Sequence, residues 1–316
     1  MDIDNIICKS EDLKDLQKEI KNEKLSKSIL LISKDSFYSF SFAKILSSLI
    51  LNNGDIEFNE NFQKIKIDAH PDVKVYPKGE KLIVAESEEI VMESFIKPIF
   101  SEKKIFIIQN IDNTLDSAQN KLLKILEEPP QNVYFILTCQ SENLVLPTIR
   151  SRCNKIELSK LKISQIEELY KDETNVNLIS ALSDGLVGKA EILKNKTNLR
   201  EIFETVLSIV VDMKSSKQVL HYSNRLSSLK ENILFILEIM SLIFEDILLI
   251  KTGGEIKLKK YIRNIETAQE DYSYKAVCEI NKLLNKALKE IFYNTNQNVV
   301  IENLLLSILE VKFVCK

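Results

Sequence analysis

Several residue types are scarce in this sequence, and their scarcity is uneven along the chain. Among 316 residues there are no tryptophans, two histidines, six glycines and six prolines. All six prolines lie at or before Pro147, and only four glycines follow Arg150. Because proline and glycine interrupt helices, the second half of the chain is free to form consecutive helices, whereas the first half contains many turns.

The sequence also lacks the patterns of several functional classes. The five cysteines include no CxxC pair, so we expect no metal site and a reducing, cytoplasmic environment. The net charge of −3 provides no general basic surface for nucleic acid. The most apolar stretch, residues 233–250, carries three acidic residues, which argues against a membrane span. The first residues contain no basic segment followed by an apolar one, so no secretory signal is expected.

What the first half does contain is a series of short apolar runs. Residues 27–33, 103–110 and 133–139 are nearly continuous in apolar residues, as is typical of parallel strands covered on both faces. Between the last two runs, five apolar residues from Leu115 to Leu126 fall on one helical stripe, and Pro129 and Pro130 end the helix. Strand, helix and strand in this order predict an α/β fold with a parallel sheet.

The residues around this unit carry a resemblance. The segment LDSAQNKLLKILEEPPQNVYFILTCQSENLVLPTIRSRC, residues 115–153, closely resembles the clamp-loader branch of the AAA+ ATPases. HPDV at residues 70–73, SDGLVGKAEIL at 183–193, FEDILLIKTGGE at 244–255 and NTNQNVVIENLLLSIL at 294–309 resemble further segments of that family. The resemblance implies an AAA+ core over residues 1–160, a small helical lid over 161–205 and an all-α collar that mediates oligomerisation over 206–316.

Two motifs needed for ATP hydrolysis are missing. In active members a GxxxxGK[ST] loop cradles the phosphates after the first strand. Here Ser33 and Tyr38 stand at the glycines, Ser39 at the lysine and Phe40 at the Ser/Thr. The acid pair expected after the next strand, which holds magnesium and polarises water, is replaced by Gln109 and Asn110. We therefore expect no bound nucleotide cofactor and no ATPase activity of the chain's own.

The Ser-Arg-Cys motif is nevertheless present. The resemblance implies that Arg152 is an arginine finger that reaches the ATP site of a neighbouring subunit, with Ser151 and Cys153 shaping the turn. Arg150 is interpreted as a solvated neighbour. The expected function is that of a non-hydrolysing stator in the replicative clamp loader. The expected partners are gamma/tau and delta subunits in a hetero-oligomer, with the sliding clamp and primed DNA.

Other polar residues have simpler interpretations. Glu127 and Glu128 form an acid pair, but ending a helix before Pro129 is the favoured role. For His70 a structural role is also favoured, because only Asp72 stands near it in the sequence. Thr138 and Lys189 occupy the family's two nucleotide-sensing positions and are expected to be structural and solvated, respectively. Two alternatives stay open: a divergent gamma/tau-type ATP-binding subunit, or a helical scaffold protein without a role in ATP turnover.

Overall fold

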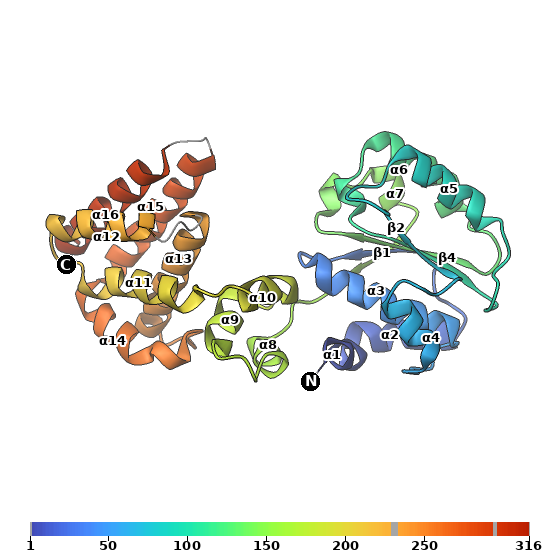
Figure 1. Cartoon of the computed structure of the whole chain (residues 1–316), viewed down its shortest axis with the longest axis horizontal. Coiled ribbons are helices and arrows are strands. Elements are labelled where there is room, and N and C mark those ends of the chain that lie inside the picture. Colours follow the sequence, from blue (N-terminus) through green and yellow to red (C-terminus); the bar gives the residue numbers. More distant parts are fainter. Residues whose placement is uncertain (1, 229–232, 293–295, 316) are drawn as a thin grey trace. The chain divides into compact units, whose positions relative to one another are not determined.

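The computed structural model describes residues 2–228, 233–292 and 296–315. It contains two compact units, residues 1–169 with 186–189, and residues 170–185 with 190–316. The first unit is a three-layer α/β structure and the second is built of helices in its described part (Figure 1).

The sheet of the first unit has five parallel strands in the order β2-β3-β4-β1-β5. The strands are β1 (Ser28–Ile32), β2 (Val73–Tyr76), β3 (Lys104–Ile108), β4 (Val133–Cys139) and β5 (Asn154–Glu157). β3 is buried along its whole length, and Phe106 stacks on Phe135 of β4 with ring centroids 5.3 Å apart. The three predicted strands and the parallel sheet are confirmed.

Helices cover both faces of this sheet, with α1 to α4 on one side and α5 to α7 on the other (Figure 1). The elements of the first unit outside the sheet are α1 (Ile3–Lys9), α2 (Glu11–Lys21), α3 (Ser36–Leu51), α4 (Glu60–Lys66), α5 (Val84–Ser94), η1 (Ile111–Asn113), α6 (Asp116–Glu127), η2 (Glu142–Leu144), α7 (Pro147–Arg150) and α8 (Ile163–Leu169). The predicted helix before the two prolines is α6, which buries Ala118, Leu122 and Leu126.

The second unit is organised around α13 (Ile233–Thr252), which packs against α11, α14 and α15. Its other elements are α9 (Val176–Ser183), α10 (Val187–Lys194, begun in the first unit), α11 (Leu199–Asp212), α12 (Ser216–Ser228), η3 (Lys259–Tyr261), α14 (Ile262–Asp271), α15 (Tyr274–Phe292) and α16 (Gln297–Val314). The first residues of the predicted collar segment, Asn294 and Thr295, lie outside the described part of the chain.

One acidic residue of the apolar helix α13, Asp246, lies in the protein interior. Asp246 is fully buried, and its carboxylate accepts hydrogen bonds from the backbone N–H groups of Lys257 at 2.9 Å and Leu258 at 2.8 Å. Among the described residues, no helix is long and apolar enough to cross a bilayer.

The predicted division into three domains stays a prediction; its boundary at 205/206 falls inside α11.

Candidate functional site

The carboxyl edge of the sheet brings the predicted site positions together. β1 ends at Ile32 and β3 at Ile108, and Leu31 of β1 is in register with Thr138 of β4. In a parallel α/β sheet, ligands bind at this edge. Three predicted site positions therefore lie on one edge of the sheet. They are the loop after β1, the pair Gln109 and Asn110 after β3, and Thr138 on β4.

The start of α3 is occupied by the chain's own carboxylate. Asp35 caps the helix: its Oδ1 accepts hydrogen bonds from the N–H groups of Phe37 and Tyr38, both at 3.1 Å. The residue is only 6% exposed. The first N–H groups of a helix and its dipole form the anion site that a phosphate uses in nucleotide-binding folds. Here that site already contains a negative charge.

The second oxygen of the same carboxylate contacts the start of α10. Asp35 Oδ2 accepts a hydrogen bond from the N–H of Gly188 at 3.0 Å. A Cβ at position 188 would lie 2.9 Å from Asp35 Oδ1 and 3.1 Å from Phe37 Cβ, so the close approach requires glycine. The expectation for Lys189, a solvated side chain, stays a prediction.

The residues at the predicted loop positions make local contacts within the first unit. Ser33 Oγ accepts from the N–H of Asp35 at 3.1 Å, and Ser39 Oγ donates to the carbonyl of Ser36 at 3.1 Å. Tyr38 is 3% exposed, and burial, with the nearby charges of Asp12 and Asp35, raises the pKa of its phenol to about 12. Phe40 lies beneath the ammonium group of Lys44, 4.2 Å from the ring centroid. The loss of the phosphate loop stays a prediction. The structure adds Asp35 to these positions, as the charged group at the start of α3.

The two positions after β3, where an acid pair was expected in active members, are Gln109 and Asn110. The N–H of Gln109 donates to the carbonyl of Tyr76 at 2.8 Å, which extends the strand pairing. Asn110 adopts a left-handed conformation with φ 49°, and its N–H donates to Thr138 Oγ1 at 3.0 Å. Thr138 is therefore bonded to the backbone of the turn; its structural role stays a prediction.

Arg152 lies just after α7, and its guanidinium makes three hydrogen bonds. Nε and Nη2 donate to Glu127 Oε2 at 2.9 Å and 2.6 Å, and Nη1 donates to the carbonyl of Thr148 at 3.0 Å. The Arg152 side chain is 28% exposed and that of Glu127 is 56% exposed. The guanidinium thus lies at the surface, paired with the last residue of α6.

The neighbours of Arg152 hold the turn. Ser151 Oγ donates to the carbonyl of Thr148 at 3.1 Å. Cys153 is 8% exposed within the core of the first unit, and burial raises the pKa of its thiol to about 12. At neutral pH this thiol is protonated and serves packing. Arg150 lies 3.6 Å from Glu142, which also contacts Lys155 at 2.8 Å.

Gln119 links Thr114, at the end of η1, to Leu146, the residue before α7, and no sequence motif marks it. The side chain is completely buried. Its Nε2 donates to the carbonyl of Thr114 at 3.1 Å, and its Oε1 accepts from the N–H of Leu146 at 3.0 Å. A polar residue on the buried stripe of an amphipathic helix was the available signal. Gln119 fixes the residue that precedes α7, and hence the turn that carries Arg152.

His70 and Asp72 have a structural arrangement. His70 Nδ1 accepts from the N–H of Asp72 at 3.2 Å, and burial lowers the pKa of the imidazole. The Asp72 carboxylate accepts from the N–H groups of Ile99, Phe100 and Ser101 at 2.6, 2.8 and 2.7 Å. Within the described ranges, no three His, Cys, Asp or Glu residues are grouped as metal ligands.

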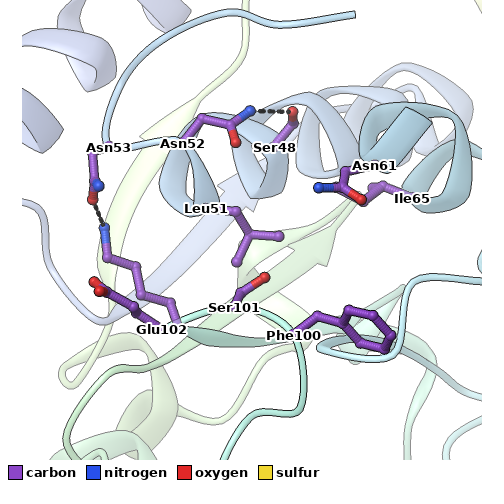
Figure 2. Close-up of a pocket in the computed structure, with 10 residues that line it drawn as sticks. Ser48, Leu51, Asn52, Asn53, Asn61, Ile65, Phe100, Ser101 and Glu102 are labelled. Carbon is purple, nitrogen blue, oxygen red and sulfur yellow. Dashed lines mark hydrogen bonds between the residues drawn. The ribbon is translucent and has the colours of Figure 1, made fainter. Parts of the chain in front are cut away.

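A pocket of about 290 Å³ lies beside this anchored loop, at the opposite end of α3 from Asp35. Figure 2 shows Phe100, Ser101 and Glu102 on one side and Asn61 with Ile65 on the other. Lys103 donates to Asn53 Oδ1 at 2.6 Å and to the carbonyl of Ile50 at 2.8 Å, so its ammonium is already bonded. This pocket is separate from the carboxyl edge of the sheet, where the predicted site positions lie.

Comparison with known proteins finds several similar proteins. Residues 8–162 match the family model described as "DNA polymerase III, delta subunit". The chain is 27% identical over 262 residues to DNA polymerase III subunit gamma of Buchnera aphidicola, covering 72% of each chain. A solved gamma subunit-related protein of Thermotoga maritima aligns with 96% of this chain and 100% of its own, at 17% identity and a TM-score of 0.47.

The chain is thus similar to the subunits of DNA polymerase III. The similarity extends along nearly its whole length to subunit delta′: it is 25% identical to that of Bacillus subtilis over 318 residues, 94% of this chain and 95% of the relative. The resemblance noted in the sequence is thereby confirmed.

Proposed function

We propose that this chain is a non-hydrolysing, delta′-type subunit of a replicative clamp loader that contributes Arg152 to the ATP site of an adjacent gamma/tau-type subunit. The complex is a hetero-oligomer with gamma/tau and delta subunits, and it loads the sliding clamp onto primed DNA. In it, this chain acts as a stator beside the ATP-hydrolysing subunits.

The observation that carries the non-hydrolysing part is the occupied start of α3. The Asp35 carboxylate takes the helix N–H groups that a phosphate would need, and a phosphate placed there would meet a like charge. No ionisable acid stands at positions 109 and 110 to hold magnesium.

The arginine part rests on position and chemistry. Arg152 lies at the surface on a short turn whose base is held by Gln119. A planar, permanently charged guanidinium can stabilise charge that develops on a transferred phosphoryl group, an effect worth about 10³-fold or more in rate. Such a residue acts on a neighbour's nucleotide and requires none in its own subunit.

The likeness to gamma subunits supports a second candidate, an ATP-binding subunit with divergent motifs. Equilibrium binding of labelled ATP with magnesium to the isolated chain separates the two, with the cognate gamma/tau subunit as the positive control. We expect no saturable binding to this chain at millimolar ATP. Saturable binding that magnesium strengthens would contradict the non-hydrolysing assignment and favour the ATP-binding one.

A further inference from the structure

The surface arginine on which the proposed function depends is engaged within its own chain. Two of its nitrogens, Nε and Nη2, share one oxygen of Glu127, at 2.9 Å and 2.6 Å. Nη1 is held by the carbonyl of Thr148. A guanidinium has two edges that offer a pair of N–H groups to an anion. One of them, formed by Nε and Nη2, faces a carboxylate here.

This pairing is suited to exchange. Glu127 is the last residue of α6 and is 56% exposed, so both the carboxylate and the arginine are in contact with water. Exposed ion pairs contribute little to stability and are screened by salt. A phosphate oxygen carries more negative charge than a carboxylate oxygen and can accept from the same two donors.

The two partners of Arg152 compete for it. The single N–H of Nε and one N–H of Nη2 donate to Glu127, so a phosphate cannot take this pair of donors at the same time. A phosphate drawn to the remaining N–H groups of Nη2 or Nη1 would lie close to the negative charge of Glu127, which disfavours its approach. The bond from Nη1 to the Thr148 carbonyl does not conflict in this way, because a carbonyl is neutral.

We propose that Glu127 is a parking site for Arg152: it holds the finger in an inactive position from which a nucleotide on the neighbouring subunit must withdraw it. The inference rests on the proposed function and adds a regulatory element to it. Glu127 then sets how readily ATP turnover begins, and its effect acts wholly through Arg152.

The test uses the reconstituted gamma/tau, delta and delta′-type complex with clamp and primed DNA, and measures steady-state ATP turnover. Glu127→Gln removes the charge but keeps an oxygen that can accept from Arg152, and Glu127→Ala removes both. Glu128→Gln is the matched control, since it makes the same charge change at the adjacent exposed residue. Arg152→Ala and the double variant Arg152→Ala/Glu127→Gln complete the set.

We expect Glu127→Gln and Glu127→Ala to raise turnover about two- to fivefold, the range set by the loss of one exposed ion pair. Glu128→Gln should match the wild type, and the double variant should be as slow as Arg152→Ala. A fall in turnover in both Glu127 variants would mean that Glu127 orients the finger for action, and would overturn the proposal.

The remaining outcomes are also decisive. Unchanged turnover in the Glu127 variants, or a gain that persists without Arg152, overturns the parking site. If Arg152→Ala is impaired while the Glu127 variants are not faster, only this inference fails. If Arg152→Ala itself is unimpaired in an intact complex, the proposed function fails.

Discussion

At the scale of single residues, the most informative group is the carboxylate of Asp35. It caps α3 and also accepts a hydrogen bond from the N–H of Gly188, so one side chain connects the start of α3 with α10. In a nucleotide-binding relative an anionic ligand would lie at this helix start. Here the chain's own carboxylate lies at this helix start.

This arrangement makes Gly188 sensitive to a single methyl group. In Gly188→Ala the new Cβ would be 2.9 Å from Asp35 Oδ1, and the clash outweighs the gain in helix propensity. We expect the free energy of unfolding of the first unit to fall by about 1–2 kcal/mol, measured by urea denaturation followed by circular dichroism. Gly79→Ala is the control, because nothing lies within 4 Å of a Cβ there. Equal stability of the two variants would contradict the close contact.

Asp72 makes a prediction about pH. Burial opposes its ionisation, but hydrogen bonds from Ile99, Phe100 and Ser101 outweigh burial and lower the pKa of the carboxyl. A lowered folded-state pKa stabilises the fold above the unfolded value of about 4, and this contribution is lost as the pH falls through the folded-state value.

Asp72→Asn should therefore cost roughly 2–4 kcal/mol at pH 7, because an amide offers one acceptor oxygen for three backbone donors. Denaturation curves of wild type and variant between pH 7 and pH 3 measure the difference, which should shrink below about pH 4. A difference independent of pH would show that the ionised carboxylate is not what holds residues 99–101.

Single residues also show the limit of the sequence. The replaced motif positions can be predicted without coordinates, because the prediction depends only on which side chains the sequence lacks there. Asp35 was missed because an aspartate before a helix is an ordinary N-cap, and only the fold brings Gly188 to its second oxygen. The bond between Arg152 and Glu127 joins residues 25 positions apart, and no local pattern reports it.

At the scale of elements, the central strands and α6 follow directly from the sequence, since complete burial leaves continuous apolar runs. The two missed strands, β2 and β5, are four-residue edge strands with partly exposed residues, and their composition carries little signal. The sequence placed Arg152 after β4 but gave no account of what fixes the turn, because Gln119 acts through two distant backbone groups.

The Gln119 bridge predicts a local effect of substitution. Gln119→Leu keeps the size of the side chain but leaves the Thr114 carbonyl and the Leu146 N–H without their partner. We expect a loss of roughly 2–4 kcal/mol in unfolding free energy and faster hydrogen exchange at Leu146. Asn120→Leu, on the exposed face of α6, is the control and should change stability by about 0.5 kcal/mol or less. Slow exchange at Leu146 in the Gln119 variant would contradict the bridge.

At the scale of the whole molecule, the chain combines a parallel α/β unit with a unit built of helices in its described part, and it is similar to DNA polymerase III subunits. The proposed function joins two properties of the first unit. The Asp35 carboxylate occupies the start of α3, and a surface turn carries Arg152. From these two properties we propose a subunit that takes part in ATP turnover without binding ATP.

The most direct test of this account is the ATP turnover of the reconstituted complex with Arg152→Ala, with assembly verified by gel filtration. Arg150→Ala is the matched control, because it removes an arginine two residues away. The account predicts a fall of at least about 10²-fold for Arg152→Ala in an intact complex, and turnover near that of the wild type for Arg150→Ala. Wild-type turnover in the Arg152 variant would contradict it and leave the chain as a passive scaffold.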